Sequence, residues 1–125
     1  RGPGFSVLGG DDGSACGAML AGADGLVSVG SNAAPAAYRR LCDLARGGDT
    51  VAAREWDARL APLHGFCGVE ANPIPVKALL QRLGHGQGLR LPLLPLSAQF
   101  QGEAAAMVAL ARELESLSGR EALAA

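Results

Sequence analysis

The sequence has 125 residues, 49% of them hydrophobic, and a formal net charge of -1 at pH 7. This length permits one ordinary globular domain. Its ten arginines and single lysine are scattered among twelve acidic residues, so we expect neither nucleic acid nor an anionic membrane as a partner. Gly, Pro or a charge interrupts every apolar stretch well short of the roughly 20 residues that a membrane-spanning helix needs.

The chain opens with two short apolar segments, each followed by a polar turn. Residues 5–8 predict a strand buried on both faces, and the turn Gly10–Asp12 leads into a short helix that ends near Ala21. Residues 26–29 predict a second strand, parallel to the first and reached by a right-handed crossover. Two such strand–helix units place their functional loops at the carboxyl ends of parallel strands.

Helical patterns fill the rest of the chain. Apolar side chains at helical spacing predict helices that begin at Pro35, Asp49, about Pro75 and about Gln101, the last one ending near Leu117. Residues 89–97 are expected to be extended, because each of their two prolines excludes the preceding residue from the helical region. The apolar stripes include the two large aromatic residues that we expect to anchor the core, Tyr38 and Trp56.

The three cysteines, Cys16, Cys42 and Cys67, are odd in number and widely spaced. A zinc site uses close cysteine pairs with histidines at ligand spacing, and His64 and His85 fit no such pattern. We therefore expect reduced, packed thiols, no metal site and, from the thiols, a cytoplasmic protein. His64 is expected to pack near the end of a helix and His85 to lie in a loop.

Two strands cannot close a sheet. Because the sequence begins at Arg1 and not at a methionine, we expect the C-terminal part of a larger enzyme with an α/β fold. Residues 1–47 would supply the last two βα units of a TIM (β/α)8 barrel, and residues 48–125 a C-terminal helical bundle.

Four segments then match, in order and spacing, a known enzyme family. They are LGGDD at residues 8–12, GLVSV at residues 25–29 running into Asn32, VEANPIPVK at residues 69–77, and LRLPLLPL at residues 89–96. With these motifs the chain resembles the C-terminal portion of the dihydrodipicolinate synthases, over nearly all of its length. The resemblance implies that the two strands are the seventh and eighth of the barrel.

The resemblance implies a lyase that condenses pyruvate with aspartate semialdehyde on the route to diaminopimelate and lysine. A lysine forms a Schiff base with pyruvate and converts its methyl group into a nucleophilic enamine, so no metal or other cofactor is expected. That lysine and a proton-relay tyrosine would lie upstream of Arg1. This chain alone would then be inactive, and the whole protein a homo-oligomer, since family members are commonly tetramers.

The resemblance also assigns three residues to the substrate site. Val27 matches the position on the eighth strand whose backbone borders pyruvate, and Gly10 and Asp11 match the turn beside the incoming aldehyde. A glycine suits this turn because a Cβ would prevent close backbone approach. From the residues alone, Asp12 is expected to cap the following helix, whereas Asp11 could cap it or hydrogen-bond a substrate.

Two further polar residues have alternative interpretations. Lys77 is the only lysine, but nothing near it in the sequence lowers its pKa, so we expect a surface residue and not a Schiff-base former. Asn72, which precedes Pro73, either forms a turn or locks the helical bundle to the barrel mouth. Two functions besides the synthase stay open: a pyruvate-dependent aldolase for a sugar-derived keto acid, and a non-catalytic barrel fragment.

Overall fold

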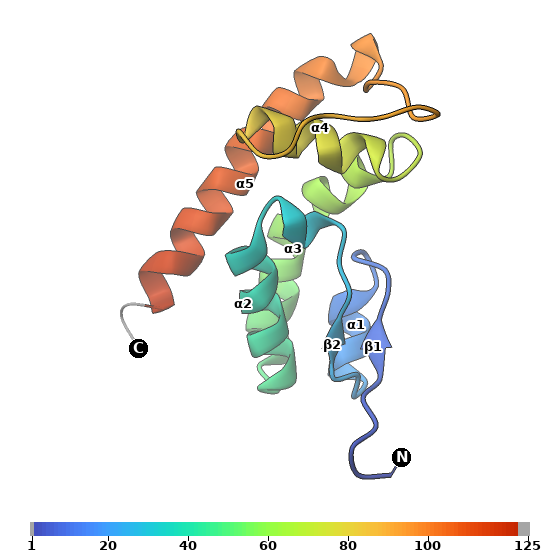
Figure 1. Cartoon of the computed structure of the whole chain (residues 1–125). Coiled ribbons are helices and arrows are strands. Elements are labelled where there is room, and N and C mark those ends of the chain that lie inside the picture. The colour runs from blue at the N-terminus through green and yellow to red at the C-terminus, as the bar shows by residue number, and fades with distance from the viewer. Residues whose placement is uncertain (1, 123–125) are drawn as a thin grey trace.

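The structure of the chain, a computed structural model, describes residues 2–122. Two short strands and one helix form a small α/β unit near the N-terminus, and the longer helices lie beside it (Figure 1). In chain order the elements are β1 (Leu8–Gly9), α1 (Ala15–Leu20), β2 (Gly25–Leu26), the 3₁₀ helix η1 (Gly30–Asn32), α2 (Pro35–Arg46), α3 (Thr50–Cys67), α4 (Ile74–Arg82), the 3₁₀ helix η2 (Ala98–Phe100) and α5 (Gln101–Ala122).

The two strands pair in parallel, as predicted, but the predicted bounds, 5–8 and 26–29, are wrong. Leu8 lies opposite Gly25 and Gly9 opposite Leu26. Before Leu8, the Asp24 side chain accepts a hydrogen bond from Val7 N at 2.8 Å, and Asp24 N donates to Val7 O at 2.7 Å. Asp24 thus occupies both backbone groups of Val7, and the regular ladder is confined to two residues on each strand.

The expected burial of both strand faces is also wrong for this chain. Four apolar side chains of the strands and their flanks are exposed: Phe5, Val7, Leu8 and Val27. Phe5 is 67% exposed and Val27 66%. A parallel strand buries both faces only where neighbouring strands and covering layers contact it, and a two-stranded sheet with one crossover helix does not provide them. The sheet therefore leaves apolar side chains exposed, and each of its two strands has an edge on which a further strand could pair.

The helices enclose the core, with α2 in contact with α1, α3 and α5. The predicted helices are all present, although α5 continues beyond the predicted end near Leu117 to Ala122. Tyr38 and Trp56 are buried, which confirms their expected place in the core. One cluster of buried side chains runs from α1 to α5, so the boundary between residues 1–47 and 48–125 stays a prediction.

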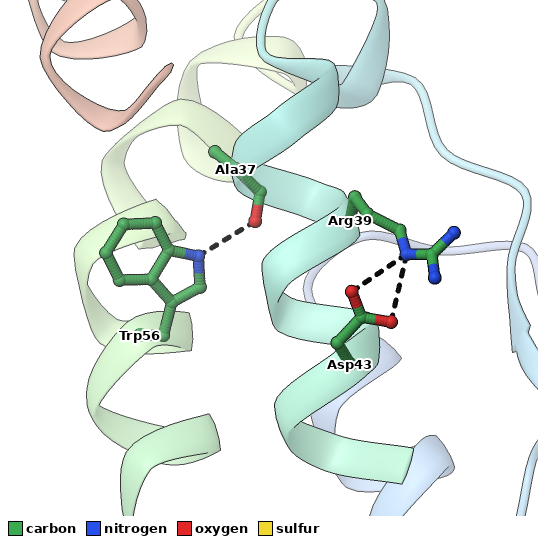
Figure 2. Close-up of polar contacts among 4 residues, drawn as sticks. All are labelled: Ala37, Arg39, Asp43 and Trp56. Carbon is green, nitrogen blue, oxygen red and sulfur yellow. Dashed lines mark hydrogen bonds and ion pairs between the residues drawn. The ribbon is translucent and has the colours of Figure 1, made fainter. Parts of the chain in front are cut away.

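Two helices hold the first turn of α2 at Ala37. Trp56 Nε1, on α3, donates to Ala37 O at 2.8 Å (Figure 2). Ala37 N, which has no partner inside α2 because it lies in the first turn, donates to Glu115 Oε1 of α5 at 2.9 Å. The Arg40 guanidinium lies 4.0 Å from the centroid of the Trp56 ring and adds a cation–π contact. A hydrogen bond between neutral groups, such as that from Trp56, contributes about 1 kcal/mol to stability, and one to a carboxylate contributes more.

An exposed ion pair lies on another part of α2, where Arg39 Nε donates to both carboxylate oxygens of Asp43 at 2.9 and 2.8 Å (Figure 2). Exposed pairs of this spacing contribute little to stability because solvent screens them. Over residues 2–122, no helix combines the length and the apolar character that crossing a membrane requires.

We predict that, in the isolated chain, amides of β1 and β2 exchange with solvent much faster than amides around Trp56 in α3. The two-residue ladder is short and its apolar side chains are exposed, whereas α3 is part of the core. We also expect self-association through residues 5–29. Hydrogen exchange with sedimentation analysis checks both expectations. Equal protection of strands and α3 in a monomer would contradict them.

Candidate functional site

The carboxyl ends of β1 and β2 and the end of α3 surround a cavity of about 370 Å³, called the mouth cavity below. Loops that follow parallel strands lie at the same edge of the sheet, which is where barrel enzymes bind substrates. The residues that line the cavity are Gly10, Asp11, Asp12, Gly13, Val29, His64, Gly65, Cys67, Gly68 and Asn72.

Two of the three predicted site residues, Gly10 and Asp11, line this cavity. Val27 is not among the lining residues; its side chain is exposed, and its backbone N donates to Gly9 O at 2.8 Å. The backbone of Val27 thus extends the contact between the two strands by one bond. The substrate roles of all three residues stay predictions.

The two carboxylates of the acidic turn have different roles, and the expected capping by Asp12 is wrong. Ser14 occupies the N-cap position of α1, and the exposed Asp11 Oδ2 accepts hydrogen bonds from Ser14 N at 2.9 Å and Ser14 Oγ at 2.7 Å. The Ser14 hydroxyl and backbone N–H lower the pKa of Asp11 below its usual value. Asp11, and not Asp12, therefore stabilises the turn before α1.

Asp12 points away from that turn, into the interior. Its Oδ2 accepts a hydrogen bond at 2.7 Å from Gly30 N, at the start of η1. A buried hydrogen bond to a charged acceptor contributes about 1.5–3 kcal/mol. The loop that follows β1 is thereby fastened to the loop that follows β2.

Gly30 approaches Tyr38 so closely that only glycine fits there. A Cβ on Gly30 would lie 2.0 Å from Tyr38 Oη and 2.6 Å from Tyr38 Cζ. Any larger residue would have to displace either η1 or the tyrosine ring, whose backbone belongs to α2. The Gly30 N–H thus lies between the buried Asp12 carboxylate and a buried tyrosine.

His64 lies in the last turn of α3, with its ring centroid 5.5 Å from that of Tyr38. Burial lowers the pKa of His64 against the opposing effect of nearby carboxylates, first Asp57 and then Asp12 and Asp11. Among the described residues, neither His64 Nε2 nor Tyr38 Oη has a hydrogen-bond partner, although both atoms are buried. The histidine is therefore predominantly neutral at neutral pH.

Burial also keeps the Cys67 thiol and the Tyr38 hydroxyl protonated. It raises the pKa of Cys67 to about 11, with a smaller effect from Asp12, and it raises the pKa of Tyr38 as well. Cys67 is thus a packed thiol and not a nucleophile at neutral pH. Cys16 and Cys42 are free cysteines too. Over residues 2–122, no three His, Cys, Asp or Glu side chains are grouped so that they could hold a metal ion.

The end of α3 was not among the predicted parts of the site. His64 was expected near a helix terminus, where it lies, but its place in the wall of the cavity was missed. The spacing of His64, Cys67 and Gly68 could have indicated that they line one surface together, since residues three and four apart share one helix face. Asn72 also lines the cavity, and Lys77 is exposed on α4, as expected.

Comparison with known proteins identifies close relatives. The family model described as "Dihydrodipicolinate synthetase family" matches residues 1–111. A 4-hydroxy-tetrahydrodipicolinate synthase from Xanthomonas campestris pv. campestris is 69% identical over 121 residues, which cover 97% of this chain and 40% of the relative. One from Xylella fastidiosa is 57% identical over 125 residues, which cover 100% of this chain and 41% of the relative.

Solved structures of dihydrodipicolinate synthases also match this chain. The dihydrodipicolinate synthase from Aquifex aeolicus matches with a TM-score of 0.81 at 36% identity, over 86% of this chain and 37% of that one. The chloride-inhibited enzyme from Acinetobacter baumannii, solved with pyruvate, matches with a TM-score of 0.80 at 39% identity, over 86% of this chain and 37% of that one. These matches confirm the predicted fold class: the last two units of a TIM barrel followed by a helical bundle.

We predict that the free energy of unfolding of the chain falls as pH decreases from about 6.5, the ordinary pKa of histidine. Burial lowers the folded-state pKa of His64, so its contribution to stability is complete above the unfolded-state pKa and is lost as pH falls toward the folded-state pKa. A His64→Gln variant should have a smaller slope between pH 6.5 and 5 in urea titrations.

The matched control is His85→Gln, because His85 is exposed in the loop after α4. Burial raises the pKa of Asp57, which gives a slope of opposite sign at lower pH, so the quantity to measure is the difference between variant and parent. Identical slopes for His64→Gln and the parent chain would contradict the prediction.

Proposed function

Since this chain belongs to the dihydrodipicolinate synthetase family, we propose that it forms the C-terminal part of a 4-hydroxy-tetrahydrodipicolinate synthase. The whole enzyme would condense pyruvate with aspartate semialdehyde in lysine biosynthesis. The observation that carries this proposal is the position of the Gly10–Asp11 turn. It follows β1 at its carboxyl end and lines the mouth cavity, in a chain that spans about 40% of the length of the curated synthase it matches.

The chemistry would begin on a lysine from the part of the enzyme that precedes this chain. Its amine would replace the keto oxygen of pyruvate with release of water, and loss of a methyl proton from the imine would give an enamine. The enamine carbon would attack the aldehyde carbon of the second substrate, and the resulting alkoxide would take up a proton. In this chain the Val27 backbone would border pyruvate.

The acidic turn would position the second substrate. Asp11 is exposed, and its bonds to Ser14 keep its carboxylate in the ionised form near neutral pH. Aspartate semialdehyde carries an ammonium group, which a carboxylate attracts. Gly10 would let the aldehyde approach the backbone, since it has no Cβ. We also propose a cytoplasmic homo-oligomer that needs no cofactor, since the Schiff base would form on a lysine of the enzyme itself.

A chimera tests the proposal: this chain replaces the matching segment of the Xanthomonas campestris synthase, to which it is 69% identical. The chimera should form a pyruvate adduct that borohydride traps, on a lysine outside residues 1–125, and should condense pyruvate with aspartate semialdehyde. A folded chimera that traps pyruvate but accepts only a sugar-derived aldehyde would favour another aldolase of the same superfamily.

We predict that the isolated chain forms no pyruvate adduct. Its only lysine, Lys77, is exposed on α4 and lies outside the mouth cavity, so its amine is not in the proposed substrate site. Intact-mass analysis after incubation with pyruvate and borohydride checks this expectation, with the chimera as the positive control. Stoichiometric labelling of Lys77 would show that the site has been misplaced.

In the chimera, we predict that Asp11→Ala lowers kcat/KM for aspartate semialdehyde on the order of 10-fold, the effect of one lost hydrogen bond at a site. Trapping of the pyruvate adduct should be unchanged. Asp43→Ala is the control, because Asp43 is an exposed carboxylate on α2 that pairs with Arg39. If Asp11→Ala abolished pyruvate trapping and left the aldehyde KM unchanged, the assignment of Asp11 would be wrong.

A further inference from the structure

The buried carboxylate of Asp12 is the feature of the mouth cavity that the proposed chemistry does not use. Asp12 is 8% exposed, and its Oδ2 accepts from Gly30 N at 2.7 Å. Asp12 also lines the cavity, but it is buried and its Oδ2 is bonded to Gly30 N, whereas Asp11 is exposed. The hydrogen bond that the structure shows for the Asp12 side chain is therefore one with the protein.

The regular ladder does not determine where the acidic turn lies. Paired residues end at Gly9 and Leu26, and the bond from Val27 N to Gly9 O is the next one along. Asp11 is bonded to Ser14, three residues away on its own turn. The Asp12–Gly30 bond spans 18 residues and connects this turn to the loop after the other strand.

The donor of that bond is itself held in place. Tyr38 Oη occupies the space where a side chain on Gly30 would begin. Ser31 N donates to Ser28 Oγ at 2.8 Å and closes the loop on itself. Tyr38 belongs to α2, whose adjacent residue Ala37 is bonded to both α3 and α5. The helical core thus fixes Gly30 N, and Gly30 N fixes Asp12.

We propose that Asp12 is a positioning residue for the second substrate: its bond to Gly30 N holds the Gly10–Asp11 turn at the distance from the loop after β2 that aldehyde binding requires. This inference rests on the proposed function. It assigns to Asp12 no contact with substrate and no proton transfer. Loss of the bond should affect the KM for aspartate semialdehyde and leave formation of the pyruvate imine unchanged.

The test uses the chimera described above. Asp12→Ala should raise the KM for aspartate semialdehyde on the order of 10-fold, with the trapped pyruvate adduct unchanged. Asp12→Asn should recover most of this loss, because an amide oxygen can still accept from Gly30 N. The matched control is Asp49→Ala, which removes a carboxylate that likewise accepts from a backbone N–H, that of Ala52 at 3.1 Å, at the start of α3. Its KM should not change.

A second set of variants tests the bond from the donor side without altering Asp12. Gly30 has no positive φ, and the three atoms nearest to a Cβ at this position all belong to Tyr38. Gly30→Ala should displace the loop and raise the KM as Asp12→Ala does. Adding Tyr38→Leu to Gly30→Ala should bring the KM back toward that of the unmodified chimera. Adding Tyr38→Phe should not, since a Cβ on residue 30 would still lie 2.6 Å from the ring atom Cζ.

The outcomes separate this inference from the function on which it rests. If the unmodified chimera is folded but traps no pyruvate, the proposed function fails. If it is active and Asp12→Ala changes only its melting temperature, as Asp49→Ala should, Asp12 is merely structural and the inference fails. It also fails if Asp12→Asn is as impaired as Asp12→Ala, because the charge and not the bond would then be required. If Asp12→Ala does not fold, the Gly30→Ala and Tyr38 variants still test the inference, which fails if Gly30→Ala leaves the KM for aspartate semialdehyde unchanged.

Discussion

The first turn of α2 is the point on which the arrangement of this molecule depends. Ala37 offers one backbone N–H and one backbone C=O, and residues from two other helices bond them: Glu115 accepts from the first and Trp56 donates to the second. A helix whose first turn is held in this way keeps the next residue, Tyr38, in place. Since Gly30 packs on the tyrosine hydroxyl, the position of the loop after β2 is set by helices far from it in the sequence.

The small sheet contributes much less to this arrangement. Its ladder is two residues long on each strand, and its flanking apolar side chains, Phe5 and Val27 among them, are exposed. Side-chain to backbone bonds supply order at both ends of the strands: Asp24 accepts one from Val7 N at their amino ends, and Asp12 accepts one from Gly30 N in the loops at their carboxyl ends. In a closed barrel, neighbouring strands would contact both edges of such a pair. The helices can pack without those strands, and the sheet cannot.

Periodicity predicted the helices from Pro35 onward because each has a buried stripe, and it placed Tyr38 and Trp56 in the core. It failed where the outcome depends on contacts distant in the sequence. The acidic turn has two adjacent carboxylates, and only the path of the loop decides that Asp11 bonds Ser14 while Asp12 turns inward to Gly30. No local pattern reveals that a glycine must face a tyrosine eight positions later. The resemblance supplied Gly10 and Asp11 of the cavity wall, but not His64 on α3.

The charges around the mouth cavity limit what this part of the protein can bind alone. Burial keeps His64 predominantly neutral and Cys67 protonated at neutral pH, and no lysine or arginine lines the cavity in the described part of the chain. Its ionisable wall is therefore acidic, which favours an ammonium group and disfavours a phosphate. Pyruvate and aspartate semialdehyde each carry a carboxylate, and a carboxylate in a partly desolvated site needs a cation or several N–H donors. The lining residues in the described part of the chain include no lysine or arginine that could supply such a cation.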